Sequence, residues 1–365
     1  MLSPIVEIRA SRTLARHAPK IVYVLSGGAA KGFCHLGMIG ALEARGVRPD
    51  LVVGTSAGAL FGALYCHYGN IAEVIARVQD VFASKEFASF ERKYFGGGQR
   101  AEAGVQGRVS RFFAGLKGTV KSGVQLGRAM VTSAMIAEDD AASIFQSIFD
   151  GITFDTLKIP FAAVAVDLVD GALVIFDSGR KAGNGKNART PAGPEGLARA
   201  VRASSAIPFV FPAVEIAGHA HADGYIMANL PVREARALAG DEDAFLVGFD
   251  VSAPVQQNEE ELSPMDLALR LLSLATRSKQ AADRELVDVL FQPVDKAVPW
   301  SSFEASRELI SMGREYMSEQ RLAELETAFI AKCVARAGRE GNPLRRMLAR
   351  AGLKRLDWEI SPRSV

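Results

Sequence analysis

Short β-branched runs alternate along this chain with longer segments whose apolar residues recur at helical spacing. The runs Ile21 to Leu25 and Leu51 to Val53 predict buried strands, and each ends at glycine before a helix-like segment. Further strands are expected at residues 161–167, 173–177, 213–216, 245–251 and 287–294. Helices are expected at residues 59–82, 141–149, 197–204, 263–284 and 303–329. This alternation predicts an α/β fold with a mostly parallel central sheet flanked by helices.

Two stretches interrupt the alternation. From Arg92 to Arg128 the chain has eight basic residues, one acidic residue and abundant glycine, which predicts an insertion or mobile cap outside the core. Residues 179–196 are expected to form a polar, turn-rich loop.

Residues 51–72 lack Asp, Glu, Lys and Arg, but the glycines near the start favour a buried strand and helix over a membrane span.

Composition narrows the class of protein. A chain of 365 residues with 48% hydrophobic residues can bury a large core, and a formal charge of +2 argues against a nucleic-acid partner. Cys34, Cys66 and Cys333 are three cysteines without C-x-x-C spacing, which excludes a disulfide framework and a zinc knuckle. Charged residues interrupt the first twenty positions where a signal peptide needs an apolar core, so we expect a cytoplasmic protein.

A G-x-S-x-G turn follows the second predicted strand. A serine at a sharp strand-to-helix turn needs small neighbours, and Gly54 and Gly58 provide them. We therefore expect Ser56 to be a nucleophile, held in a turn that also contains Thr55 and Ala57. The alternative is a tight turn without chemistry. Carboxyl ends of parallel strands share one sheet edge, so this turn should lie beside the turn after the first strand.

That first turn, Gly27-Gly28-Ala29-Ala30-Lys31-Gly32, fits no nucleotide-binding motif. A P-loop needs Ser or Thr after a lysine that follows its last glycine, whereas Phe33 follows Gly32, and a dinucleotide fingerprint needs glycine where Ala29 stands. The remaining interpretation is a row of backbone N–H groups able to stabilise an oxyanion. A turn chosen only for close helix packing is the alternative.

A nucleophilic serine needs a base, and two arrangements are open. His221 with Asp167 or Asp177 would imitate the Ser-His-Asp order, but no histidine occurs after residue 221. Asp223 follows a strand-like approach, and Gly224 lets the chain turn so that the carboxylate faces the sheet edge. An aspartate in that position can take the serine proton directly, in a Ser-Asp dyad.

These motifs resemble those of the patatin-like phospholipases. The glycine-rich G-G-G-x-R/K-G motif of that family is matched by residues 27–32, its G-x-S-x-G by residues 54–58 and its D-G-G/A by Asp223-Gly224-Tyr225. The connecting stretches AVRASSAIPFVFPAV and ADGYIMANLPV are also similar, and the resemblance covers about residues 20–320. Two positions depart from the pattern. Ala29 replaces a glycine, which is tolerated if its φ is negative, and Tyr225 either narrows the acyl entrance or packs outward.

The resemblance implies a lipid acyl hydrolase with Ser56 as nucleophile, Asp223 as general base and the amides of the first turn as oxyanion hole. It also implies a domain over residues 20–325, with core motifs in residues 20–240 and an insertion at about 88–140. A polar arm over residues 1–19 and a basic helical tail over residues 326–365 would flank it. An acyltransferase using the same dyad and a non-catalytic membrane-docking regulator are the alternatives.

No cofactor or metal is expected, because the chain has no EF-hand-like loop and no His/Cys ligand cluster. The expected partner is a phospholipid or acyl-lipid substrate. Residues 108–128 place apolar side chains on one helical face with basic residues around it, which favours peripheral binding to an anionic membrane surface, such as the inner membrane face. An ordinary surface helix packed on the core is the alternative.

Overall fold

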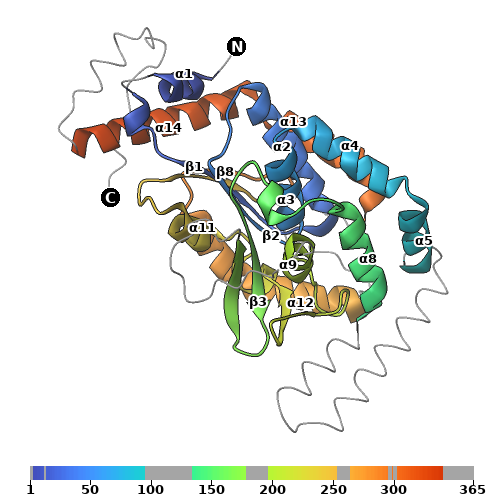
Figure 1. The fold of residues 1–365 in the computed structure, drawn as a ribbon. Helices are drawn as coiled ribbons and strands as arrows, with labels where there is room; N and C mark the ends of the chain where they lie inside the picture. Colours follow the sequence, from blue (N-terminus) through green and yellow to red (C-terminus); the bar gives the residue numbers. More distant parts are fainter. Residues whose placement is uncertain are drawn as a thin grey trace.

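The computed structural model describes residues 3–11, 14–94, 134–177, 196–252, 264–294, 298 and 302–339 (Figure 1). Most of the predicted insertion, including the basic segment 108–128, lies outside the described residues, as does the tail beyond residue 339. The described part is an α/β fold built on one eight-stranded sheet, as the sequence predicts. None of the described helices is both long and apolar enough to cross a membrane.

The sheet has the order β5-β6-β3-β2-β1-β7-β8, and β4 pairs with β3 outside this path. The pairs that link β3, β2, β1, β7 and β8 are all parallel. The pairs made by β4, β5 and β6 are antiparallel. The strands are β1 (Ile21–Leu25), β2 (Leu51–Thr55), β3 (Phe161–Asp167), β4 (Ala172–Asp177), β5 (Val214–Ile216), β6 (His219–Asp223), β7 (Phe245–Phe249) and β8 (Val289–Phe291).

Helices cover both faces of the sheet, so the parallel strands are buried on both sides. Alternate residues of β1 show this: Tyr23 and Leu25 belong to a large core with α2, α3 and α4, while Val22 and Val24 face a smaller core with α11 (Figure 1). The helices are α1 (Pro4–Ala10), α2 (Phe33–Ala44), α3 (Ala57–Tyr68), α4 (Ile71–Phe82), α5 (Lys85–Tyr94), α8 (Glu138–Ile148), α9 (Gly196–Ser204), α10 (Tyr225–Ala228), α11 (Val232–Ala239), α12 (Pro264–Arg284), α13 (Ser306–Tyr316) and α14 (Glu319–Arg339).

Two segments predicted as single long helices are each broken in two. Between α3 and α4, Gly69 adopts a left-handed φ of 66° that ends one helix, and the Asn70 side chain accepts hydrogen bonds from the first amides of the next. Between α13 and α14 the chain turns at Met317 and Ser318. Apolar periodicity continues across both breaks, which is why it did not reveal them.

The first residues belong to the packed fold, whereas a polar arm was expected over residues 1–19. Pro4–Ala10 forms α1, whose Ile5 and Ile8 are buried in the main core beside α14. Arg9 pairs with Asp50 just before β2. Two buried isoleucines thus hold this segment to the core although it also carries the charged residues Glu7 and Arg9.

Candidate active site

Ser56 occupies the turn between β2 and α3 in a strained backbone conformation. Its φ is 56° and its ψ is −123°, and the residue is almost fully buried. The neighbouring glycines are required by space: a Cβ at Gly54 would lie 2.4 Å from the Gly58 oxygen, and one at Gly58 would lie 2.3 Å from the Leu25 oxygen. The G-x-S-x-G pattern therefore reflects a crowded strand-to-helix turn, as predicted.

Ser204, at the end of α9, holds this turn from the side. Its Oγ accepts a hydrogen bond of 3.0 Å from the Ser56 amide and donates one of 2.6 Å to the Val164 oxygen of β3. Residue Ser204 is fully buried. Sequence reasoning did not single it out, because it is 148 residues away from Ser56. The only hint in the sequence was the pair Ser204-Ser205 at the end of a predicted helix.

Asp223 reaches Ser56 through the strand register. Because β4 pairs with residues 162–167 along one edge of β3, β2 and β6 must share the other edge. There Thr55 pairs with Val164, and Asp223 pairs with Ala165, the next residue of β3. The C-terminal ends of β2 and β6 thus meet head to head, which brings the predicted nucleophile and base together.

Burial dominates the electrostatics of Asp223. It raises the pKa of the carboxyl to about 7, while the hydrogen bond from the Tyr225 amide and the nearby Ser56 hydroxyl lower it. The Tyr225 amide donates to Oδ1 at 2.8 Å. The other oxygen, Oδ2, is buried and has no hydrogen bond of ordinary geometry. The Ser56 hydroxyl is thus close enough to affect the carboxylate without closing a direct bond, as is common in enzymes without substrate.

The glycine-rich turn presents a smaller set of free amides than the sequence predicts. Its residues Ala29–Gly32 form a short 3₁₀ helix leading into α2. The Gly27 amide donates to the Asn229 oxygen at 3.2 Å, and the Lys31 amide donates to the Gly28 oxygen at 3.1 Å. Amides at a helix start have no intrahelical acceptor. The backbone amides of Gly28 and Ala29 are therefore the first candidates for oxyanion donors, and the Ala30 amide is the next.

Ala29 departs from expectation. A negative φ was expected to make alanine acceptable here, but its φ is 49°, in the left-handed region that costs L-residues about 1–2 kcal/mol. Gly28 is required by space, because an added Cβ would lie 2.5 Å from the Val251 Cγ2.

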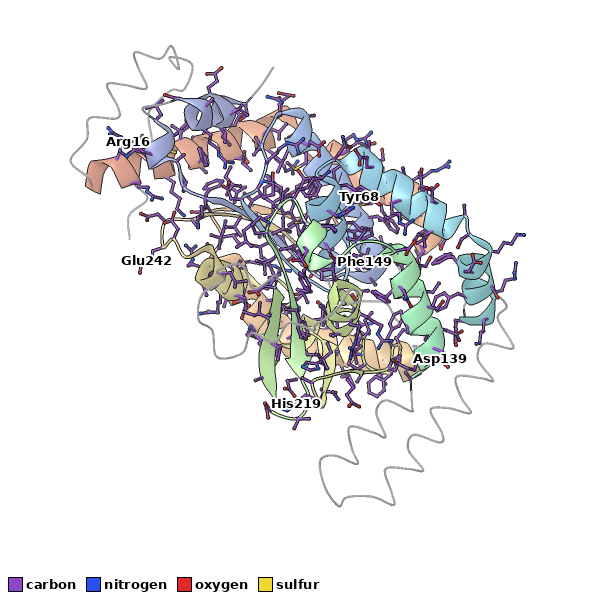
Figure 2. The ribbon with its side chains drawn as sticks, in the orientation of Figure 1. Arg16, Tyr68, Asp139, Phe149, His219 and Glu242 are labelled. Atoms are coloured by element: carbon purple, nitrogen blue, oxygen red, sulfur yellow. The ribbon has the colours of Figure 1, made fainter. Side chains whose placement is uncertain are left out.

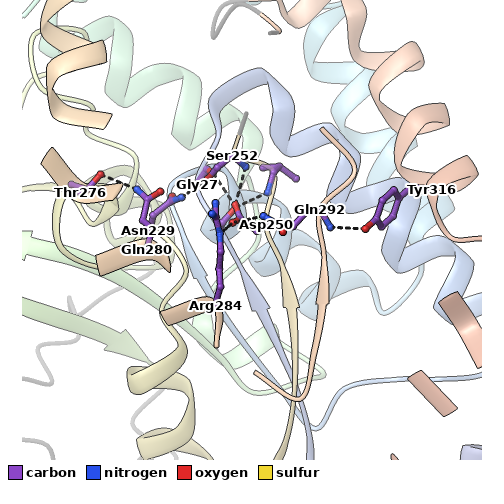
Figure 3. A network of polar contacts seen from close by, with 11 residues as sticks. Gly27, Asn229, Asp250, Ser252, Thr276, Gln280, Arg284, Gln292 and Tyr316 are labelled. Carbon is purple, nitrogen blue, oxygen red and sulfur yellow. Dashed lines mark hydrogen bonds and ion pairs between the residues drawn. The ribbon is translucent and has the colours of Figure 1, made fainter. Parts of the chain in front are cut away.

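A polar network supports the glycine-rich turn from behind (Figure 3). The backbone oxygen of Asn229 accepts the hydrogen bond from the Gly27 amide, and its side-chain Nδ2 donates to the Ser252 Oγ at 2.7 Å. Asp250 accepts from the Ser252 amide at 2.8 Å and from the Arg284 Nε at 2.6 Å. These bonds link α10, β7 and α12 to the glycine-rich turn.

The histidine alternative is not assembled among the described residues. His221 directs Nδ1 to the Val214 oxygen at 3.2 Å and packs its ring against Phe176. His219, labelled in Figure 2, lies at the start of β6. Its Nδ1 is 2.8 Å from the Asp167 Oδ2. Asp170 completes a group of three ligand-type residues with His219 and Asp167. Asp167 is already occupied by His219 and by two backbone amides, so this group is accounted for as a hydrogen-bonded turn.

A cavity of about 420 Å³ opens beside Ser56. Its wall is mostly aromatic and aliphatic and comes from α2, α3, α4, α5, α8, the loop after α9 and the segment before α13. Its polar members are Ser56, Arg92, Ser205 and Glu304. The apolar lining residues include Phe33, Leu60, Phe61, Val78, Val81, Phe82, Phe87, Phe90, Ile144, Phe145, Ile148, Ile207, Phe211 and Phe303. Tyr225 is half-buried and is not part of this lining. An apolar chain attached to a reacting carbonyl would fit such a space.

Comparison with known proteins places these features in a family. A family model described as patatin-like phospholipase matches residues 23–236. Uncharacterized NTE family proteins of Mycobacterium tuberculosis and Mycobacterium bovis are 26% identical over 255 residues, which is 70% of this chain and 54% of the relative. Lysophospholipase NTE1 of Scheffersomyces stipitis is 39% identical over 88 residues, 24% of this chain and 5% of that protein. The chain spans about half the length of the mycobacterial relatives.

Two solved structures are also similar to this chain, more distantly. VipD from Legionella pneumophila has a TM-score of 0.40 and 15% identity, covering 85% of this chain and 67% of its own. Human GIVD cytosolic phospholipase A2, solved with methyl gamma-linolenyl fluorophosphonate, has a TM-score of 0.37 and 12% identity, covering 87% of this chain and 60% of its own.

Proposed function

The chain belongs to the patatin-like phospholipase family, and on that premise we propose that it hydrolyses carboxylic esters of phospholipids or related acyl lipids through Ser56 and Asp223. One observation carries the proposal: the pairing of Thr55 and Asp223 with consecutive residues of β3 sets a strained serine beside a buried carboxylate. The neighbouring helix start supplies N–H groups, and the apolar cavity supplies room for an acyl chain.

The mechanism follows from these groups. Ionised Asp223 takes the proton of the Ser56 hydroxyl while Oγ attacks the ester carbonyl, and the oxyanion that forms accepts hydrogen bonds from the Gly28 and Ala29 amides. Collapse of this intermediate breaks the ester bond, and the protonated Asp223 gives its proton to the leaving alcohol. Water then attacks the acyl-enzyme with Asp223 again as base, which releases the fatty acid and restores Ser56.

The cavity supports a substrate with a long apolar chain. Most of its lining is carbon, and the polar side chains Arg92 and Glu304 are few among aromatic ones. A yeast relative is named a lysophospholipase, which makes a one-chain phospholipid a suitable first substrate to test. Diacyl phospholipids and simple acyl esters complete the set.

The test is fatty acid release by the purified protein from phospholipids and lysophospholipids, together with labelling by a fluorophosphonate probe. We expect Ser56→Ala to lose both, since removing a nucleophile costs on the order of 10⁶ in turnover when the catalytic groups act as a unit. Asp223→Asn should be nearly as damaging. Activity of Ser56→Ala within about tenfold of wild type would contradict the proposal.

Histidine variants serve as matched controls. His219→Ala and His221→Ala remove side chains from the same strand as Asp223 without touching the dyad. Each should keep probe labelling, because the His219 and His221 rings are directed to Asp167 and Val214. Loss of labelling in His221→Ala alone would instead favour a Ser-His-Asp arrangement.

A further inference from the structure

Ser26 lies directly after β1, immediately before the glycine-rich turn, and it is fully buried. Its backbone is bonded to two other elements. The Ser26 amide donates to the Phe249 oxygen of β7 at 2.9 Å, and the Ser26 oxygen lies 2.9 Å from the His35 Nε2 of α2. The glycine-rich turn therefore starts from a residue that is fixed to the sheet and to α2.

The hydroxyl of Ser26 joins two further backbone groups. Its Oγ accepts a hydrogen bond of 2.9 Å from the Val251 amide, in the chain that follows β7. A backbone amide can only donate, so the hydroxyl hydrogen stays available, and it is donated to the Gly27 oxygen at 3.1 Å. The Gly27 carbonyl is thus held toward the side of β1 on which β7 lies.

This carbonyl shares one peptide group with the Gly28 amide, a candidate oxyanion donor. In a planar trans peptide the C=O and N–H bonds point in opposite directions. Strand β1 lies between β7 and β2. A Gly27 carbonyl held on the β7 side therefore directs the Gly28 N–H toward the β2 side, where Ser56 lies. The two parts are close, because a Cβ at Gly27 would lie 3.0 Å from the Ser56 Cβ.

The preceding peptide group is held at both ends. Its carbonyl, that of Ser26, lies beside the His35 Nε2, and its amide, that of Gly27, donates to the Asn229 oxygen at 3.2 Å (Gly27 and Asn229 are labelled in Figure 3). Rotation of the Gly27–Gly28 peptide group is then opposed by the Ser26 hydroxyl. An N–H group stabilises a developing oxyanion best when it is aimed before the reaction starts.

We propose that Ser26 is a positioning residue for the oxyanion hole, whose hydroxyl holds the Gly27 carbonyl so that the Gly28 N–H faces the reacting carbonyl at Ser56. Ser26 acts through the Gly27–Gly28 peptide group and does not touch the substrate. The inference rests on the proposed function, because an oxyanion forms only if Ser56 attacks an ester.

The experiment begins with kinetics on a short, water-soluble ester. Ser26→Ala should lower kcat roughly 30-fold and keep KM within about twofold, since losing a whole oxyanion donor costs about 10²–10³ in kcat and misdirecting one costs part of that. Ser26→Cys fills a similar space, but its thiol is a weak donor. Its kcat should fall almost as far, which separates the hydrogen bond from packing.

Ser3→Ala is the matched control. Ser3 is also fully buried, and its Oγ accepts from a backbone amide, that of Ile5 at 3.2 Å, but it caps α1. This variant should unfold at lower urea than wild type and keep its kcat. A fall in kcat in Ser26→Ala is then not a general effect of losing a buried serine hydroxyl.

Inhibition by a trifluoromethyl ketone tests the oxyanion directly, because its adduct with a nucleophilic serine carries an oxyanion. In Ser26→Ala the inhibitor should bind more weakly by about the same factor as kcat falls, while KM hardly changes. Unchanged inhibition beside a lowered kcat would contradict the inference.

Hydrogen exchange in the peptide that spans residues 26–32 reports on the turn without any reaction. Exchange should be faster in both Ser26 variants and unchanged in Ser3→Ala. Ser26→Ala with unchanged exchange, or with kcat within about twofold of wild type, overturns the inference. Wild-type protein without esterase activity rejects the proposed function instead, and faster exchange in the Ser26 variants would then leave the hold of Ser26 on the turn intact.

Discussion

The backbone amide of Ser56 donates a hydrogen bond of 3.0 Å to the hydroxyl of Ser204, which in turn donates to the Val164 oxygen at 2.6 Å. Ser204 thus links the strained turn to the strand beside it. The same strand residue, Val164, pairs with Thr55. A side chain on α9 therefore helps to set the orientation of the candidate nucleophile without facing the substrate.

Loss of the Ser204 hydroxyl should lower turnover more than substrate binding. In Ser204→Ala the buried Ser56 amide and Val164 oxygen lose their partner, which costs about 1–3 kcal/mol in the free energy of unfolding. We expect kcat to fall about tenfold with KM unchanged, because a loosened turn misplaces Oγ. Kinetics on a soluble ester and urea unfolding measure the two effects. Ser311→Ala, an exposed serine on α13, is the control, and an unchanged kcat in Ser204→Ala would show a purely structural role.

Activity should rise with pH through neutrality. Burial raises the pKa of Asp223 to about 7, and only the ionised form can take the serine proton. We therefore expect kcat/KM to increase about tenfold per pH unit below that value and to level off above it. The measurement is hydrolysis of a soluble ester from about pH 5 to about pH 9. A profile that is flat across this range would mean that the base has an ordinary carboxyl pKa.

The raised pKa of Asp223 also predicts how the free energy of unfolding depends on pH. The pKa of Asp223 is higher in the folded protein than its usual value of 3.8, so between 3.8 and about 7 the folded state binds a proton more tightly than the unfolded state. Stability is therefore lost as pH rises through this window. Asp223→Asn cannot ionise, and we expect it to unfold at higher urea than wild type at about pH 8 but not at about pH 4. Equal midpoints at both pH values would argue against the raised pKa.

The strain at Ala29 can be tested with neighbouring alanines. Because Ala29 has a φ of 49°, Ala29→Gly should raise the free energy of unfolding by about 1 kcal/mol and keep kcat within about threefold. The matched variant Ala30→Gly, at the next position of the same short helix, should instead lower stability by about 1 kcal/mol. Urea unfolding of both variants decides the matter. Equal destabilisation by the two changes would remove the left-handed conformation of Ala29 as an explanation.

Local sequence patterns predicted most of the strands and turns of this protein. Strands β1 and β2, the turns after them and the position of Ser56 follow from β-branched runs ending in glycine, because such turns tolerate no larger residue. The alternation of strands and helices also predicted the mostly parallel sheet. The breaks within residues 59–82 and 303–329 were missed, since a capped turn leaves the apolar spacing almost unchanged.

The sequence alone identified Ser56 and Asp223 as residue types able to do this chemistry, but it left a histidine alternative open. Tertiary structure decided which acidic group meets the serine, because the shared edge of β3 is a long-range register that no local pattern encodes. It also decided the support by Ser204, the raised pKa of Asp223 and the hydrogen bond from the Val251 amide to the Ser26 hydroxyl. Each of these depends on burial and on contacts between distant segments, and those exist only once the chain has packed.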